Sequence, residues 1–276
     1  MQQEKVWFVT GGSSGFGRAF TEYALSRQYA VVAAARNLAK LSDLAGSHPD
    51  DLLVVRMDVN DRHQIEEAVR QAEQRFGRID VLINNAGYGI VGAVEETPEE
   101  ELRAQMETNF FGAVAVTRAF LPMFRRQRNG AIVNISSMGG QLSVAGFGAY
   151  SASKFALEGI SEALAQEMKP FGVKVLIVEP GQFRTDLAGS AMRYMPEIEA
   201  YRETAGGTRN FARSMHGTQE GDPLKAARAI DAALRNENTP LRLQLGEDAV
   251  RAIRSHVETL LGESAVWEDA AKNTHF

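Results

Sequence analysis

Residues 6–20 read VWFVTGGSSGFGRAF, which combines a short apolar run, a glycine-rich turn and the start of a helical pattern. Two interpretations of the turn compete. Residues 11–15, GGSSG, match the G-x-S-x-G turn that presents a nucleophilic serine in many hydrolases. They also match a phosphate-binding turn between a strand and a helix, where glycines let the backbone approach an anion at the helix N-terminus.

The place of this turn in the chain favours the phosphate-binding interpretation. Only one expected strand precedes Ser13, so no earlier strand–loop junction can supply a backbone N–H to an esterase oxyanion hole. Gly11 suits a turn with positive φ, whereas Gly15 and Gly17 allow close approach to a ligand and close packing of the helix. The spacing is G-x-x-x-G-x-G rather than the commoner G-x-G-x-x-G. We therefore expect Ser13 and Ser14 to place their hydroxyls around a phosphate.

The rest of the chain continues the alternation of strand and helix. Apolar, β-branched runs predict strands at 6–10, 30–35, 52–59, 81–84, 131–136, 173–179 and 241–245. Most are apolar at consecutive positions, as strands covered on both faces are. Amphipathic segments predict helices near 17–28, 61–76, 98–126, 150–169, 223–235 and 247–261. The third helix is expected to begin with a capping box, in which Thr97 is the N-cap and Glu100 its partner. This alternation predicts a doubly wound parallel α/β sheet in a single domain spanning residues 1–276.

Length and composition limit the classes of function. The 276 residues are 44% hydrophobic and 24% charged, as in an ordinary globule with a sizeable core. A net charge of -5 argues against a nucleic-acid or anionic-membrane partner. Without cysteine there is neither a disulfide nor a thiolate metal site, and we expect no metal. No apolar run is long enough to span a bilayer, and residues 1–5 lack a signal-peptide stretch, so we expect a cytoplasmic protein.

Residues 182–222 interrupt the alternation and are called the lid segment below. They hold no convincing strand, and long loops in compact domains are usually functional or disordered. The large apolar and aromatic side chains of the segment are Met192, Tyr194, Met195, Tyr201, Phe211 and Met215. They favour a lid over a substrate pocket, and the alternative is a surface helical pair with a small core of its own.

Tyr150 and Lys154 are spaced for chemistry. On a helix, positions i and i+4 share a face, so the Lys154 ammonium is expected to lie beside the Tyr150 phenol. A neighbouring cation favours the phenolate, which brings proton exchange closer to neutral pH. The alternative is an ordinary surface Tyr–Lys pair.

Polar residues end two of the expected strands, and a Pro-Gly turn follows a third. The stretch GAIVNISS ends at Ser137, NNAG occupies 84–87, and Pro180-Gly181 follows the strand at 173–179. In open parallel sheets, ligands bind at the carboxyl ends of the strands. We therefore expect these strand ends, the glycine turn and the Tyr–Lys pair to meet in one crevice.

With these motifs in this order, the chain resembles the short-chain dehydrogenase/reductase family, most distinctly up to about Leu187. The matching residues are Thr10 to Gly17 (TGGSSGFG), Asp58-Val59, Asn84 to Gly87 (NNAG), Asn109, Ser137, Tyr150-x-x-x-Lys154, and Pro180-Gly181 followed by Thr185. The resemblance implies a seven-stranded Rossmann-type sheet with strand order 3-2-1-4-5-6-7, a nicotinamide cofactor, and hydride transfer between an alcohol and a carbonyl.

The resemblance also implies roles for four catalytic residues. Tyr150 would donate a proton to the carbonyl oxygen, and Lys154 would hold the nicotinamide ribose and lower the tyrosine pKa. Ser137 would hydrogen-bond the substrate oxygen. Asn109 would position a water that links Lys154 to solvent, unless it is a buried, satisfied amide at a helix kink.

Further residues are implied to bind the cofactor. Asp58 would accept from the adenine amino group, and Val59 would pack against the ring. Phe16 and Phe183 replace the smaller aliphatic residues usual in the family, and Phe183 is expected to narrow the nicotinamide side of the pocket. The full cofactor-binding set is Gly11, Ser13, Ser14, Gly15, Phe16, Gly17, Arg36, Asp58, Val59, Asn85, Ala86, Gly87, Tyr150, Lys154, Pro180, Gly181, Phe183 and Thr185.

The end of the second strand predicts which nicotinamide cofactor is bound. An NAD-preferring site places a carboxylate there to accept from the ribose 2′-OH, but this chain has Ala35 followed by Arg36. A guanidinium can instead bind a 2′-phosphate. We expect NADP(H), and with it carbonyl reduction as the physiological direction; the alternative is that Arg36 is only a solvated helix-entry residue.

These observations predict an NADP(H)-dependent short-chain dehydrogenase/reductase acting on a small-molecule carbonyl or secondary alcohol, with a hydrophobic or aromatic ketone favoured by the lid segment. The alternative is a non-catalytic NADP(H)-binding sensor on the same fold. Such proteins typically lose the tyrosine or the lysine, whereas Tyr150 and Lys154 are both present. Because family members usually associate through the helices expected at 98–126 and 150–169, we expect a homodimer or homotetramer.

Overall fold

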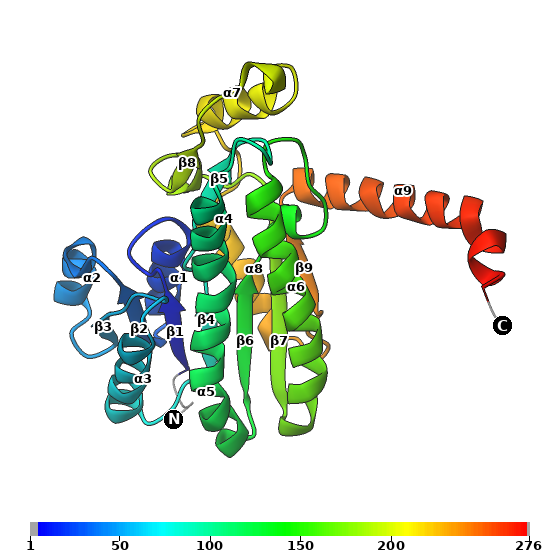
Figure 1. Ribbon diagram of the computed structural model, residues 1–276. Coiled ribbons are helices and arrows are strands. Elements are labelled where there is room, and N and C mark those ends of the chain that lie inside the picture. The colour runs from blue at the N-terminus through cyan, green and yellow to red at the C-terminus, as the bar shows by residue number, and fades with distance from the viewer. Residues whose placement is uncertain (1–4, 275–276) are drawn as a thin grey trace.

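Seven parallel strands form the central sheet in the computed structural model, which describes residues 5–274 (Figure 1). They are β1 (Val6–Thr10), β2 (Ala30–Ala35), β3 (Leu52–Arg56), β4 (Val81–Asn84), β6 (Gly130–Ile135), β7 (Val173–Pro180) and β9 (Arg242–Leu245). Their order in space is β3-β2-β1-β4-β6-β7-β9, and every neighbouring pair is parallel. Numbered within this sheet alone, that is the expected order 3-2-1-4-5-6-7, so the predicted fold class is confirmed.

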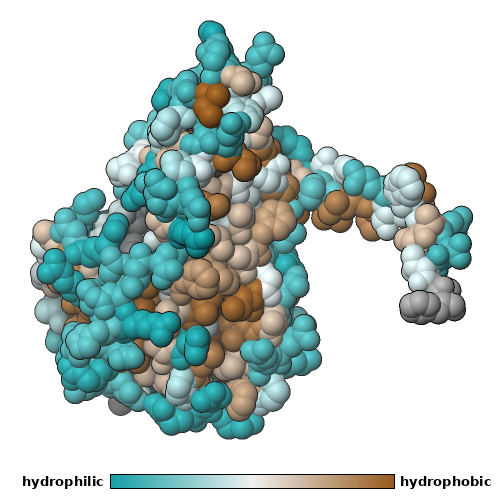
Figure 2. All heavy atoms as spheres, in the orientation of Figure 1, coloured by the Kyte–Doolittle hydropathy of each residue, from teal (hydrophilic) through white to brown (hydrophobic). Residues whose placement is uncertain are grey.

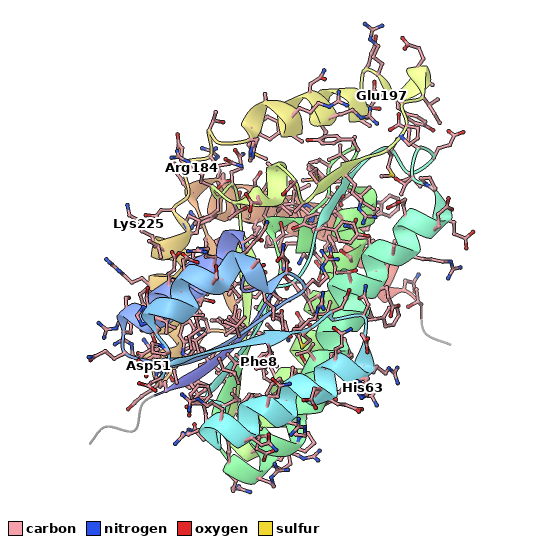
Figure 3. The ribbon with its side chains drawn as sticks, turned by 90° about the vertical axis from the view of Figure 1, so that its left-hand side faces the viewer. Phe8, Asp51, His63, Arg184, Glu197 and Lys225 are labelled. Atoms are coloured by element: carbon pink, nitrogen blue, oxygen red, sulfur yellow. The ribbon has the colours of Figure 1, made fainter. Side chains whose placement is uncertain are left out.

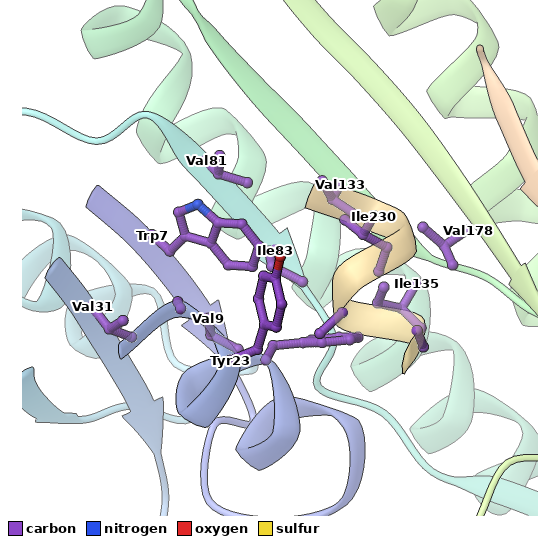
Figure 4. Close-up of a cluster of buried hydrophobic side chains, with 14 of the residues drawn as sticks. Trp7, Val9, Tyr23, Val31, Val81, Ile83, Val133, Ile135, Val178 and Ile230 are labelled. Atoms are coloured by element: carbon purple, nitrogen blue, oxygen red, sulfur yellow. The ribbon is translucent and has the colours of Figure 1, made fainter. Parts of the chain in front are cut away.

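Helices cover both faces of the sheet (Figure 1). One face packs against α1 (Gly15–Ser26), α2 (Ser42–Ser47) and α8 (Pro223–Arg235), and the other against α3 (Arg62–Phe76), α5 (Ala113–Gln127) and α6 (Gly148–Met168). In β1, Trp7 and Val9 enter the first core, where Trp7 lies near Tyr23 (Figure 4), whereas Phe8 enters the second core. Strands buried on both faces explain why their sequences are apolar at consecutive positions.

The lid segment differs from its prediction. It contains a strand, β8 (Met192–Tyr194), which pairs in parallel with β5 (Gly89–Val91), and a helix, α7 (Ala205–Met215). Both lie above the carboxyl ends of the central strands in Figure 1. The expectation of no convincing strand was therefore wrong, because a three-residue strand is too short to show an apolar pattern and depends on its partner.

Two predicted helices also differ in detail. The segment expected as one helix at 98–126 consists of α4 (Glu99–Met106), the π-helix η2 (Glu107–Gly112) and α5. The expected capping box is absent, because Pro98 precedes the first helical residue and Thr97 Oγ1 donates to the Ala93 carbonyl instead. The last helix, α9 (Glu247–Lys272), runs well beyond the expected end.

Short 3-10 helices complete the described chain. They are η1 (Leu38–Leu41), η3 (Met138–Gly140), η4 (Lys169–Phe171), η5 (Asp186–Ala188) and η6 (Glu199–Tyr201). None of the helices within residues 5–274, the long α9 included, carries an apolar stretch sufficient to cross a bilayer.

Candidate active site

A cavity of about 1150 Å³ opens at the carboxyl ends of the central strands. Every residue expected at the site lines it, except Gly17 and Asn109. The lid segment forms its outer wall, and in the side view of Figure 3 it spans the top of the molecule between Arg184 and Glu197. The structure thus brings together strand ends that lie far apart in the sequence.

The glycine turn leaves the start of α1 open to an anion. Gly11 and Gly15 adopt φ values of +65° and +50°, which side chains rarely tolerate. The Ser14 side chain makes no capping hydrogen bond within the described residues, and no acidic residue occupies the first turn. The first N–H groups of a helix lack intrahelical partners, so this end of α1 suits a phosphate.

Gly17 has a packing role rather than a ligand contact. A Cβ atom at Gly17 would lie 2.1 Å from the Gly11 carbonyl oxygen and 2.6 Å from Asn85 Nδ2. Asn85 in turn donates to the Thr10 carbonyl oxygen at 2.9 Å, and the Thr10 hydroxyl accepts from the backbone N–H groups of Asn85 and Ala86 at 2.9 and 3.0 Å. The end of β4 is therefore fixed directly to the glycine turn.

The end of β2 carries positive charge. Arg36, Asn37 and Lys40 all line the cavity next to the buried Ala35, and Arg36 is exposed. Within residues 5–274, neither Arg36 nor Lys40 makes a salt bridge through its side chain. Sequence analysis missed Lys40, although its position four residues after Arg36 was an available signal. Asp58, also on the cavity wall, accepts a hydrogen bond from the backbone N–H of Asn60 at 3.0 Å.

Tyr150, Ser137 and Lys154 meet on the inner wall of the cavity. Burial raises the pKa of the Tyr150 phenol, and a hydrogen bond with Ser137 offsets this only in part. Lys154 Nζ donates to the Ile135 carbonyl oxygen at 2.8 Å and lies 5.8 Å from the centre of the Tyr150 ring. Burial lowers the pKa of Lys154 to about 8. The tyrosine pKa is thus raised, in contrast to the lowering expected from its lysine neighbour, because burial outweighs the hydrogen bond with Ser137.

Asn109 lies in the π-helix behind the cavity wall and is 1% exposed. Its side-chain nitrogen donates to the Tyr88 carbonyl at 2.9 Å and to Ser153 Oγ at 3.1 Å, and its side-chain oxygen accepts from the Tyr88 N–H at 3.1 Å. The amide therefore fastens the segment after β4 to α6. This is the geometry of the satisfied-amide alternative, and the water-positioning role stays a prediction.

Two buried carboxyls lie behind the catalytic helix, and sequence analysis did not find them. Glu158 follows Lys154 by one turn on α6, and Glu179 lies near the end of β7. Arg242 Nε is 3.0 Å from Glu158 Oε2 and 3.2 Å from Glu179 Oε1, and the Gln141 amide donates to both carboxyls at 3.2 and 2.9 Å. Burial raises the pKa of Glu158 to about 7, and it raises the pKa of Glu179 as well.

The lid presents apolar side chains to the cavity and is held from behind. Of its large apolar side chains, Met192, Phe211 and Met215 line the cavity. Phe183 packs against Phe16, with ring centroids 5.1 Å apart, so it joins the core as well as the cavity wall. The remaining large lid residues, Tyr194, Met195 and Tyr201, do not line the cavity.

Behind the lid, a buried ion pair connects it to the body. Arg209 on α7 contacts Glu96, which precedes α4, at 2.8 Å, and both side chains are almost fully buried. The Arg209 guanidinium also donates to the Met195 carbonyl at 3.3 Å. These contacts fix the height of the lid above the catalytic residues.

Comparison with known proteins identifies the family. A family model described as short chain dehydrogenase matches residues 5–195. Oxidoreductase BOA17 of Botryotinia fuckeliana is 39% identical over 266 residues, which cover 96% of this chain and 97% of that protein. A 3-ketodihydrosphingosine reductase of Bacteroides thetaiotaomicron is 40% identical over 249 residues, which cover 88% of each.

Solved structures agree with this assignment. A short-chain dehydrogenase from Streptomyces avermitilis has a TM-score of 0.94 and 50% identity, covering 99% of this chain and 100% of its own. A Burkholderia phymatum member in complex with NAD has a TM-score of 0.82 and 25% identity, over 95% and 97% of the two chains. A Burkholderia cenocepacia member in complex with NADP has a TM-score of 0.75 and 27% identity, over 96% and 98%. The protein is therefore an oxidoreductase that belongs to the short-chain dehydrogenase/reductase family, of which some solved members are complexes with NAD or NADP.

Proposed function

We propose that the protein is an NADP(H)-dependent reductase of apolar carbonyl compounds. The observation that carries this proposal is the meeting of Tyr150, Ser137 and Lys154 in one cavity, which begins at the glycine turn and ends beneath an apolar lid. The cofactor, when bound, supplies or accepts the hydride. A cytoplasmic location and assembly into a homodimer or homotetramer remain predictions from the sequence.

The residues present fit a dinucleotide that carries a 2′-phosphate. The open N-terminus of α1 suits the diphosphate, and Asp58 with Val59 suits the adenine end. Arg36 and Lys40, which have no salt-bridge partner in the described chain, suit the additional phosphate at the end of β2. The solved relatives include both NAD and NADP complexes, so the preference for NADP(H) depends on this local charge.

The raised pKa of Tyr150 suits reduction. A phenol whose pKa is raised stays protonated at neutral pH and can donate its proton to the oxygen of a carbonyl as that oxygen gains charge. The Ser137 hydroxyl, which is hydrogen-bonded to Tyr150, would donate to the same oxygen. Lys154, one helical turn away, favours the phenolate that proton donation leaves behind.

The lid favours an apolar substrate. Met192, Phe211 and Met215 of the lid, together with Val144 and Phe147, add apolar side chains to the cavity wall. One relative is called 3-ketodihydrosphingosine reductase, a name that designates a ketone substrate. This supports a ketone as the substrate of the present protein. We propose a hydrophobic or aromatic ketone as the substrate class.

Tyr150→Phe tests the reaction. NADPH oxidation with a panel of apolar ketones and aldehydes should fall by about two orders of magnitude or more, because the variant loses its general acid. The matched control is Tyr88→Phe, which removes another phenol hydroxyl from the wall of the same cavity and should leave most of the activity. Tight NADPH binding by the wild type without turnover of any carbonyl would instead support the sensor.

Arg36→Ala tests the cofactor. It should weaken NADPH binding by roughly 10- to 100-fold, the effect of removing a charged hydrogen bond, and should change NADH binding little. Binding is measured by titration of protein fluorescence with each cofactor. The control is Arg56→Ala at the end of the adjacent strand β3, which does not line the cavity. Equal losses for the two cofactors would refute a 2′-phosphate contact.

A further inference from the structure

Helix α9 is buried only over its first turns. Ala249 and Ile253 have 0% and 4% exposure, whereas every residue from Val257 to Thr274 is exposed. Figure 2 shows the later part of the helix standing clear of the body. The start of α9 packs against β9 and against η3, the 3-10 helix that follows Ser137. The first turn of α9 therefore lies next to the cavity wall near Ser137.

The Asp248 carboxylate in this first turn binds the backbone just after β7. Its Oδ2 atom accepts a hydrogen bond from the Gln182 N–H at 2.8 Å. The preceding N–H group, that of Gly181, donates instead to the Leu245 backbone carbonyl at 2.9 Å. Because its acceptor is a side chain, the bond to Gln182 can be removed by a single substitution.

Two glycines make room for this carboxylate. A Cβ atom at Gly181 would lie 2.2 Å from Asp248 Oδ1, and one at Gly246 would lie 2.5 Å from the same atom. Neither distance is sterically possible, so a side chain at either position would displace the carboxylate. Within residues 5–274, Asp248 takes part in no salt bridge. Its carboxylate is therefore fitted to the turn after β7 rather than paired with a cation.

The turn that Asp248 holds is the part of the cavity wall implied to receive the nicotinamide. Residues 180–183 and Thr185 line the cavity, whereas Asp248 does not. A hydrogen bond to an ionised acceptor is roughly twice as strong as one between neutral groups. Asp248 can therefore act on a bound cofactor through the backbone of this turn, without touching the cofactor itself.

We propose that Asp248 is a positioning residue for the nicotinamide end of the cofactor. By binding the Gln182 N–H, its carboxylate holds the turn in the conformation that receives the nicotinamide before the cofactor arrives. The inference rests on the proposed function, because it needs a nicotinamide cofactor in this cavity. It also gives the first turn of α9 a function, although every site residue expected from the sequence precedes Asp186.

Asp248→Ala tests this role through the binding of two ligands, measured by isothermal titration. NADPH should bind roughly tenfold more weakly than to the wild type, because the cofactor must then order the turn itself. Adenosine 2′,5′-bisphosphate, which carries the adenine end of the cofactor but no nicotinamide, should bind within about twofold of wild type. Unchanged NADPH binding would overturn the proposal. Equal weakening of both ligands would also overturn it, since the role would then be a general structural one.

Two further variants of the first turn separate hydrogen bonding from other effects. Asp248→Asn keeps an oxygen that can accept from the Gln182 N–H, so it should bind NADPH within about threefold of wild type. The matched control is Glu247→Ala, which removes an exposed carboxylate from the neighbouring position and should leave both affinities unchanged. An Asp248→Asn variant as weak as Asp248→Ala would contradict a role as hydrogen-bond acceptor.

Gly181→Ala tests the same contact from the side of the turn. Its Cβ would displace the Asp248 carboxylate, so it should weaken NADPH binding about as much as Asp248→Ala does. Because both substitutions break one contact, the double variant should bind NADPH no more weakly than the weaker single variant. Additive losses would overturn the proposal. A wild type that binds neither NADPH nor the bisphosphate would instead refute the proposed function, and this inference with it.

Discussion

Two groups of buried carboxyls lie near the cavity, and their pKa values shift in opposite directions. Glu96, behind the lid, has its pKa lowered although it is 4% exposed. Glu158, behind the catalytic helix and also 4% exposed, has its pKa raised to about 7. Both are paired with an arginine. Burial alone therefore does not decide the direction of the shift.

The difference lies in the kind of donor that each carboxyl receives and in the second carboxyl, Glu179, whose charge raises the pKa of Glu158. Burial acts to raise the pKa of Glu96, but backbone N–H groups of Ile198 and Ala93, at 2.8 and 2.7 Å, and the Arg209 guanidinium outweigh it. Glu158 and Glu179 instead share one guanidinium and one amide. Glu158 Oε1 and Glu179 Oε2 have no hydrogen-bond partner within residues 5–274. Each unsatisfied oxygen favours the protonated form.

The two groups therefore suit different tasks. Glu96 stays ionised over the physiological pH range, so its pair with Arg209 is a permanent connection between lid and body. The Glu158 and Glu179 pair gains and loses a proton near neutral pH, one helical turn from Lys154. We expect the Glu96–Arg209 pair to contribute to the free energy of unfolding at every physiological pH. We expect Glu158 and Glu179 to determine how that free energy depends on pH.

Arg209→Ala should have the largest effect. Removing one partner leaves the Glu96 charge buried and unpaired, which costs about 3–5 kcal/mol. Urea unfolding at neutral pH measures this loss. The control is Arg213→Ala on the same helix, because Arg213 is about half exposed and lies 3.6 Å from the exposed Glu197, and such a pair contributes less than about 1 kcal/mol. Similar losses of unfolding free energy for the two variants would show that the Arg209–Glu96 pair does not hold the lid to the body.

Glu158→Gln should change how stability depends on pH. The folded-state pKa of Glu158 is above its unfolded value of 4.5, so the folded state binds more protons between pH 4.5 and about 7. Stability of the wild type therefore falls as pH rises through this window, by up to about 3 kcal/mol from this group. The variant lacks the titrating group, so its free energy of unfolding should change less over the same window.

The control for this comparison is Glu162→Gln, which lies one turn further along α6. Glu162 also pairs with Arg242 but is half exposed. Urea unfolding at several pH values should show that the free energy of unfolding of Glu162→Gln depends on pH as it does in the wild type. Superimposable profiles for Glu158→Gln and the wild type would contradict the raised pKa.

The central sheet and most of the cavity wall could be predicted from the sequence because their signals are local. Consecutive apolar residues mark strands such as β1, and the TGGSSGFG turn, Ser137 and the Tyr150–Lys154 spacing each lie within a few residues. Gly17 was placed in the correct turn, but its packing role depends on Asn85, which is distant in the sequence.

The buried carboxyls and the strand and ion pair of the lid segment could not be predicted, because their environment is assembled from distant segments. In the sequence, Glu158 looks like an ordinary polar residue of an amphipathic helix, because its partner Arg242 lies 84 positions away. Arg209 is 113 positions from Glu96. β8 is visible only through its pairing with β5. Single-sequence patterns contain no information on such contacts.

The smallest predicted effect concerns catalysis at alkaline pH. Burial lowers the pKa of Lys154 to about 8, and the negative charge of Glu158 acts in the opposite direction. Glu158→Gln removes that charge, so the pKa of Lys154 should fall further. If the reaction needs the Lys154 ammonium, the alkaline limb of kcat/KM should move to lower pH, by roughly 1 unit or less. The test is kcat/KM measured from pH 6 to pH 10 with a ketone that the enzyme reduces. In the control variant Glu162→Gln, the alkaline limb should stay at its wild-type pH. A shift in neither variant would mean that the field of Glu158 does not reach the proton-transfer step, and the carboxyl pair would then act on stability alone.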